Sequence, residues 1–298
     1  MNLQAARYVL LLATLFGTSL VASRLGVGQF SALTYTGLRL TLTSLGHLLV
    51  YLLAMGGRRW PTDGRLWRRA SFLGMFDTAV PMSCMVLSLQ YQSSGLTAIL
   101  ATVGPAITVL LAHFFLPDER LSRRKALGVA LAFGGALLLG LLGESGLPDV
   151  HRANPIGYLL VLGAMLSASA MTIYTRRQMG GFDSFQVTSV RMFTATLVVL
   201  PLSLILVGFD LSRVTWQGYA ALGYGALVGT FFAFWLLIVV IQRFGATAAA
   251  TTLYISPVIT SVGGMLVLDE TITAGMAAGI ALIAAGIALL NTRPRRGS

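Results

Sequence analysis

Long apolar runs separated by short polar stretches dominate this chain, and each run is hydrophobic on all sides rather than at alternate positions. A run of about 20 such residues is long enough to cross a bilayer as a helix, whereas barrel strands would alternate over about ten residues. We therefore predict an all-α polytopic membrane protein with ten transmembrane helices, at Ala6–Ser23, Ser31–Met55, Ala70–Leu89, Ser94–Phe115, Ala126–Leu142, Ile156–Thr175, Ser184–Phe209, Gly218–Ile241, Ala246–Leu268 and Ala274–Asn291.

The second half of the chain repeats the first, weakly but in register. Each copy holds five spans, an odd number, so the two copies must enter the membrane in opposite orientations, as in the inverted repeats of secondary transporters. We place the first repeat at residues 1–143 and the second at 156–291. At a spacing of 152 residues, and then of 151, the matching pairs are Arg24/Arg176, Arg39/Arg191, Thr78/Thr230, Gln90/Gln242, Pro105/Pro257, Asp118/Asp269, Glu119/Glu270, Gly128/Gly279 and Gly135/Gly286.

Composition supports a membrane protein and explains the basic charge. Of 298 residues, 56% are hydrophobic and only 10% are charged, with a mean hydropathy of +0.80, whereas about a quarter of residues are charged in soluble domains. The net charge of +11 could indicate a nucleic-acid partner. With both termini cytoplasmic, however, 16 of the 21 Lys and Arg fall on the cytoplasmic side, as the positive-inside rule requires. We therefore expect the lipid bilayer, and no nucleic acid, as a partner.

Two prolines occupy equivalent mid-span positions, Pro105 in the fourth span and Pro257 in the ninth. A proline inside a helix removes one backbone hydrogen bond and displaces the preceding turn. Paired interruptions of this kind in the two halves point to a transport site. Kinks that only shape the packing of the helices are an equal alternative.

Hydroxyl and aromatic side chains gather in the spans around these prolines. A cavity of hydroxyl groups and aromatic faces would suit a neutral or zwitterionic substrate with an apolar side chain. In the alternative interpretation the aromatic rings face lipid and the hydroxyls bond their own helices. The candidate substrate-cavity residues are Phe16, Ser19, Asp77, Thr78, Thr97, Pro105, Ser169, Phe231, Phe234, Trp235, Thr251, Tyr254 and Pro257.

Few ionisable residues lie within the spans, where a charge is costly and is functional by default. Arg39 and Arg191 lie near span ends, so we expect their long side chains to reach the interface and act as anchors. Asp77 and His47 lie at similar depth on consecutive antiparallel spans. We hypothesise that these two side chains approach each other and share a proton, with a non-functional polar contact as the alternative.

Sequence motifs of catalysis are missing. The chain has no GxxxxGK[ST], HExxH or GxSxG pattern, and no metal ligands at a recognisable spacing. The single cysteine, Cys84, cannot form an intrachain disulfide. We therefore expect no enzyme activity, no cofactor and no bound metal.

Over nearly its whole length the chain resembles the EamA repeat of the drug/metabolite transporter superfamily. The resemblance implies two inverted five-helix repeats, cytoplasmic termini, and a central cavity lined by helices one, three, four, six, eight and nine. Helices five and ten, rich in small residues that let helices pack closely, would be scaffold or a contact between copies in a homo-oligomer. The residues that carry it are Gln90, Ser94–Ala98, Pro105, Asp118, Glu119, Gly128 and Gly135, and then Gln242, Ala246–Ala250, Pro257, Asp269, Glu270, Gly279 and Gly286.

Within the superfamily, the mid-span aromatic residues make the chain most similar to the YddG branch of bacterial aromatic amino-acid exporters. We therefore expect a multi-pass transporter of a bacterial inner (plasma) membrane that exports small metabolites, above all neutral and aromatic amino acids, by alternating access. A carrier of nucleotide-sugars, phosphate esters or drugs with the same fold is an alternative, as is a non-transporting membrane scaffold. Anionic substrates would require Arg39 and Arg191 to turn inward.

Overall fold

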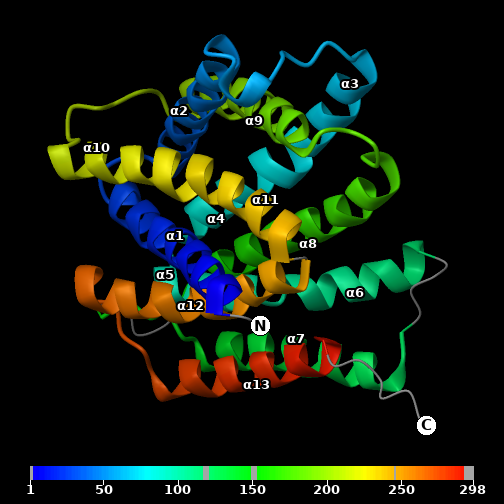
Figure 1. The fold of residues 1–298 in the computed structure, drawn as a ribbon. Helices are drawn as coiled ribbons and strands as arrows, with labels where there is room; N and C mark the ends of the chain where they lie inside the picture. The colour runs from blue at the N-terminus through cyan, green and yellow to red at the C-terminus, as the bar shows by residue number, and fades with distance from the viewer. Residues whose placement is uncertain (1–2, 117–120, 149–152, 245, 292–298) are drawn as a thin grey trace, which may run out of the picture.

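The fold is known from a computed structural model that describes residues 3–116, 121–148, 153–244 and 246–291, and every regular element in these ranges is helical (Figure 1). Asp118, Glu119 and Arg152, like the basic residues Arg293, Arg295 and Arg296, lie outside the described residues. The elements are α1 (Leu3–Val27), α2 (Ala32–Leu52), η1 (Met55–Gly57), α3 (Gly64–Leu73), η2 (Gly74–Ala79), α4 (Val80–Ser88), α5 (Ser94–Ala101), α6 (Gly104–Phe115), α7 (Arg123–Leu142), α8 (Pro155–Gln178), α9 (Ser184–Leu206), α10 (Trp216–Gly223), η3 (Tyr224–Phe232), α11 (Ala233–Phe244), α12 (Ala246–Leu268) and α13 (Ala274–Asn291).

Eight helical stretches of the described residues are long and apolar enough to cross a membrane. Three of them join consecutive elements: α3 to α4, α5 to α6, and α10 to α11. The two remaining predicted spans correspond to α13, whose apolar stretch is shorter, and to α2, which carries many hydroxyl groups together with Arg39 and His47. The all-helical, multi-pass fold is therefore confirmed, while the count of ten spans stays a prediction.

The outer surface of the helices is apolar. Leu197, Ile205 and Leu266 are 72%, 80% and 77% exposed, and many other large apolar side chains share this exposure. Soluble monomers rarely expose contiguous apolar patches of this extent. In a bilayer these side chains meet lipid tails, so their exposure carries no penalty.

Several helices begin at a polar residue that sits in the loop just before the apolar run. The side chain of such an N-cap residue accepts a hydrogen bond from a backbone N–H of the first turn, which has no partner within the helix. Residues that cap a helix in this way include Ser31, Ser93, Ser122, Asn154 and Asp183.

Equivalent helices of the two halves lie side by side, as α7 and α13 show most clearly (Figure 1). A Cβ atom added at Gly128 would lie 2.7 Å from the carbonyl oxygen of Gly286, and one at Gly135 would lie 2.9 Å from that of Gly279. As the position rises along α7, its contact on α13 falls, so the two helices are antiparallel. Antiparallel packing of equivalent helices means that the halves are inverted relative to each other. The glycine-containing faces of α7 and α13 thus pack against each other within one chain.

The central pair of equivalent helices, α2 and α9, packs in the same manner. The hydroxyl oxygens of Ser44 and Thr196 lie 2.8 Å apart, and these positions are separated by 152 residues. Each is therefore in contact with its own repeat equivalent. Such a contact can form only on the two-fold axis that relates the halves.

Adjacent glycines on α7 provide a matched test of this packing. Gly135 lies against the backbone of α13, whereas a Cβ atom at Gly134 would meet nothing within 4 Å. We expect Gly135→Ala to destabilise the protein by roughly 1–3 kcal/mol through overpacking. Gly134→Ala should leave stability unchanged or raise it slightly, because alanine favours a helix. Thermal unfolding of the two purified variants in detergent measures the difference, and equal melting temperatures would contradict the α7–α13 contact.

Candidate functional site

The third and eighth spans each contain a π-helical segment, η2 and η3, and the two segments overlap in the repeat alignment. A π-helical segment shifts the register of the side chains that follow it and is frequent at functional sites. Hydroxyl groups bond the carbonyls of both segments: Thr230 Oγ1 donates to the carbonyl of Gly225 at 2.8 Å, and Ser167 on α8 donates to that of Phe76. The segments hold two repeat-equivalent pairs, Asp77–Thr78 and Gly229–Thr230, at a common cavity.

This cavity has a volume of about 310 Å³ and lies between the two halves. Elements α1, α2, η2, α4 and α5 of the first half and α9, η3, α11 and α12 of the second half all contribute to its wall. Small-molecule sites typically measure about 300–1,000 Å³ and are mostly apolar with a few polar groups. The wall fits this description, since Met82, Met85 and Pro81 line it together with the edge-to-face rings of Phe16 and Phe234, whose centroids are 5.7 Å apart.

Six of the thirteen residues that the sequence places in a substrate cavity line this one. They come from four elements, α1, η2, α11 and α12, and thus from both halves of the chain. They are Phe16, Ser19, Asp77, Thr78, Phe234 and Pro257.

Three of the others, Thr97, Pro105 and Ser169, lie around a break in the fourth span. The sequence predicts a kink within one continuous helix, but α5 ends at Ala101 and α6 begins at Gly104, which places Pro105 in a first turn, where a proline is tolerated. Ser169 Oγ on α8 donates to the carbonyl of Gly104 at 3.0 Å. Thr97 accepts a hydrogen bond from Gln92 Nε2 at 3.0 Å. Pro257, by contrast, lies inside the continuous helix α12.

The remaining four, Phe231, Trp235, Thr251 and Tyr254, do not line the main cavity. The ring of Phe231 packs against the imidazole of His47, and Trp235 is 49% exposed on the outer surface. Tyr254 lines a second, smaller cavity of about 190 Å³, which shares Thr102 and Pro257 with the first. Thr251 lies on α12 and lines neither of these cavities.

Arg39 and Arg191 do not extend to the membrane interface as expected; both line the cavity. Arg39 Nε donates to Thr230 Oγ1 at 2.9 Å, while Arg191 donates to Thr78 Oγ1 from Nε at 3.3 Å and from Nη2 at 3.1 Å. Each arginine thus crosses to the π-helical segment of the opposite half. The anchoring interpretation fails because it counts residues from the span end and ignores the polar groups that the neighbouring helices present.

Asp77 forms an ion pair with Arg191, with 2.5 Å between Oδ2 and Nη2. Their side chains are 18% and 17% exposed. An ion pair that is shielded from water to this degree is strongly destabilised when either partner is removed alone. Asp77 therefore has a cationic partner from the second half of the chain.

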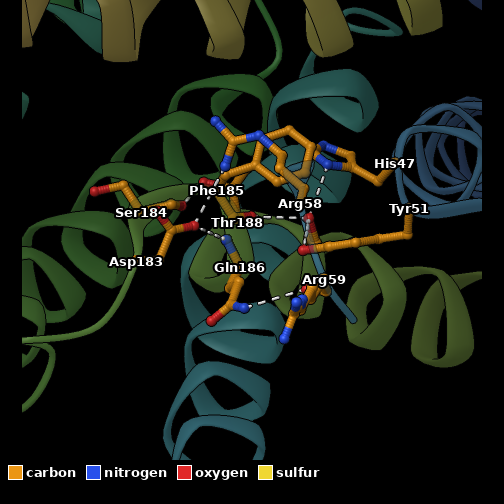
Figure 2. A network of polar contacts seen from close by, with 10 residues as sticks. His47, Tyr51, Arg58, Arg59, Asp183, Ser184, Phe185, Gln186 and Thr188 are labelled. Atoms are coloured by element: carbon orange, nitrogen blue, oxygen red, sulfur yellow. Dashed lines mark hydrogen bonds and ion pairs between the residues drawn. The ribbon is translucent and has the colours of Figure 1, made fainter. Parts of the chain in front are cut away.

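The predicted pair of Asp77 and His47 is not formed. Nδ1 of His47 lies 2.9 Å from the hydroxyl of Ser189, and its ring packs between Phe185 and Phe231, at centroid distances of 4.9 and 5.1 Å. Both residues lie deep in their spans, as expected. Asp77 lines the cavity, whereas His47 points toward α9 (Figure 2).

His47 belongs to a polar network that joins the segment after α2 to the start of α9 (Figure 2). Arg58 Nη1 lies 3.4 Å from Asp183 Oδ1, and the Arg58 guanidinium lies 4.1 Å above the ring of Phe185. Tyr51 donates a hydrogen bond of 3.1 Å to Ser189. None of these residues lines the cavity. The network therefore contributes to the packing of α2 against α9 at one end of these helices.

The cavity is also lined by residues outside the predicted set, among them Arg39, Arg191, Thr230, Ser256 and Thr260. A signal for the first three is present in the repeat alignment, because it pairs both the arginines and the threonines that they contact. Among the described residues, no group of three or more His, Cys, Asp or Glu could hold a metal ion.

Comparison with known proteins agrees with this geometry. The EamA-like transporter family matches the chain twice, over residues 4–141 and 155–292. The chain belongs to the EamA-like transporter family. As an EamA-like protein it is a multi-pass membrane transporter, and the halves of its cavity wall are two copies of the EamA unit.

Several relatives share this EamA-like architecture over most of their length. The uncharacterized transporter YoaV of Bacillus subtilis is 24% identical over 278 residues, 93% of each chain. The uncharacterized inner membrane transporter YedA of Escherichia coli is 25% identical over 87% of this chain and 81% of its own. A probable amino-acid metabolite efflux pump of Salmonella typhimurium is 28% identical over 65% of this chain and 66% of its own. A crystal structure with a TM-score of 0.62 and 20% identity covers 98% of this chain and 97% of its own, which supports the fold alone.

The ion pair of this EamA-like protein is open to a double-mutant test. Asp77→Asn and Arg191→Gln each leave one charge unpaired, so we expect each single variant to lower the melting temperature by roughly 5 °C or more. The double variant removes both charges and should recover at least half of that loss. Thermal unfolding in detergent at constant salt measures all four proteins. Strictly additive losses would show that the pair contributes nothing as a pair.

Proposed function

We propose that this EamA-like protein exports neutral, above all aromatic, amino acids from a bacterial cell by alternating access, with both termini in the cytoplasm of the inner membrane. The two repeats, proposed as residues 1–143 and 156–291, would rock against each other around a fixed central site, as inverted repeats do in secondary transporters. The observation that carries the proposal is the cavity of about 310 Å³ to which both halves contribute aromatic, hydroxyl and charged side chains.

The aromatic part of the wall supports an apolar side chain on the substrate. Phe16 and Phe234 present ring edges and faces to the cavity from opposite halves. A third aromatic ring adds an edge-to-face or offset-stacked contact with either of them, worth about 0.5–1.5 kcal/mol beyond the burial of its area. The name of the Salmonella relative, an amino-acid metabolite efflux pump, points to the same class of substrate.

The inward position of Arg39 and Arg191 favours a second candidate, a carrier of anionic metabolites such as phosphate esters or nucleotide-sugars. Asp77 neutralises one of these arginines, which leaves a formal charge of +1 on the wall from Arg39, Arg191 and Asp77. A wall with one excess positive charge suits a zwitterion or a monoanion better than a dianionic phosphate ester. For this reason we place amino acids first.

Flux into proteoliposomes tests the proposed function directly. Purified full-length protein is reconstituted and supplied with radiolabelled phenylalanine or tryptophan, with protein-free liposomes as the control. We expect saturable uptake that other neutral amino acids inhibit by competition. Exchange of a phosphorylated or sugar substrate, without amino-acid flux, would overturn the proposed substrate class. Absence of flux for all of these compounds would favour a non-transporting membrane scaffold.

Neighbouring phenylalanines allow a matched test of the cavity. Phe234 lines it, whereas Phe232 is 47% exposed on the outside of the helix bundle. We expect Phe234→Ala to reduce the apparent affinity for phenylalanine by roughly 2- to 10-fold, the equivalent of one aromatic contact. Phe232→Ala should have no such effect. The apparent affinities are measured by concentration-dependent uptake, normalised to reconstituted protein. An equal loss of affinity in both variants would mean that the substrate does not bind beside Phe234.

A further inference from the structure

Among the three charged residues of the cavity wall, Arg39 is the most deeply buried, at 7% exposure. Within the described part of the chain, its hydrogen-bond acceptors are neutral hydroxyls: Thr230 at 2.9 Å, Ser23 at 2.6 Å and Ser19 at 2.7 Å. A cation within a bilayer is costly and is functional by default. Hydroxyl groups solvate this cation, but they do not neutralise it.

The hydroxyl groups around Arg39 are fixed as acceptors. Ser23 Oγ donates its own hydrogen to the carbonyl of Ser19 at 2.8 Å, and Thr230 Oγ1 donates to that of Gly225 at 2.8 Å. Their lone pairs are therefore turned toward the guanidinium. A guanidinium carries five N–H donors, and the hydroxyls take one each from Nε, Nη1 and Nη2. One N–H on each terminal nitrogen is not used by these three hydroxyls, and Arg39 lines the cavity.

The equivalent arginine of the other half has a different environment. Arg191 is paired with Asp77, and the repeat equivalent of Asp77 is Gly229. A Cβ atom at Gly229 would lie only 2.1 Å from Ser19 Oγ, so no side chain fits there while Ser19 holds Arg39. The fold therefore cannot supply Arg39 with the carboxylate that it supplies to Arg191.

We propose that Arg39 binds the carboxylate of the transported substrate, so that the substrate pairs with Arg39 as Asp77 pairs with Arg191. This inference rests on the proposed function, and it assigns the substrate class as small carboxylates with an apolar side chain. In this proposal the remaining N–H of Nη1 and that of Nη2 donate to the two oxygens of the carboxylate. Binding also cancels the formal charge of +1 on the wall, while Phe16 and Phe234 remain for the apolar side chain.

Ligand pairs that differ only in the carboxylate test the assignment. We would measure binding to the purified full-length protein for L-phenylalanine against phenylalaninol, and for 3-phenylpropionate against 3-phenylpropanol. The wild-type protein should prefer the carboxylate of each pair by about 10- to 100-fold, the usual contribution of a charge-assisted hydrogen-bonded contact.

Variants of the arginines identify the group responsible. Arg39→Gln should abolish the preference, and Arg39→Lys should keep part of it, because lysine retains the charge without the planar pair of donors. The double variant Asp77→Asn/Arg191→Gln leaves Arg39 as the one charge of the three, so the wall keeps its charge of +1 and the preference should persist. Gel-filtration profiles show whether each variant is folded, and Arg39→Lys keeps the test valid if Arg39→Gln is not.

Loss of the preference in the double variant, with its retention in Arg39→Gln, would assign the carboxylate to Arg191 and overturn the proposal. A wild-type protein with no preference would overturn it as well, and so would tighter binding of phenyl phosphate than of 3-phenylpropionate. The proposed function fails separately: a carboxylate preference that depends on Arg39, without flux of any amino acid, would keep the site and exclude amino-acid export. Amino-acid flux without a carboxylate preference would keep the proposed function and exclude the proposed role of Arg39.

Discussion

Two guanidinium groups held inside the bilayer constrain this structure more than any other feature. Hydrocarbon offers them no partner, so a guanidinium that leaves water needs polar groups of the protein around it. Arg39 and Arg191 meet this requirement by crossing to a threonine of the opposite half, Thr230 and Thr78. The contact that satisfies the charge thereby also joins the halves and makes the wall of the cavity polar.

The departures from symmetry define the chemistry of the cavity. Ser19, which holds Arg39, corresponds to Met171 in the second half, and Asp77 corresponds to Gly229. The fourth span breaks between Ala101 and Gly104, whereas the equivalent α12 continues through Pro257. A symmetric cavity could hold a ligand in two opposite orientations. In the proposed site, these differences would give one end of the ligand a cationic partner and leave the rest of it against apolar side chains.

Most of the fold could be read from the sequence, because span length, hydropathy and the repeat are properties of the chain itself. Only part of the site could be predicted from the sequence. Asp77, Thr78 and Phe234 were identified by their depth and by their place in the repeat, but depth does not tell which way a side chain points. Trp235 directly follows Phe234 and faces outward, since successive residues of a helix point about 100° apart. The inward turn of Arg39 depends on hydroxyls of two other helices, which no local pattern reveals.

The contact between Ser44 and Thr196 joins a position to its own copy. A single five-helix unit, present in the membrane in both orientations, would make this contact with a second molecule of itself, as it would the crossed glycine contacts of α7 and α13. Within one polypeptide the chain thus makes the contacts that two antiparallel copies of such a unit would make. Fusion frees the two copies to diverge: Asp77 in one half with Gly229 in the other is a difference that two identical subunits could not have.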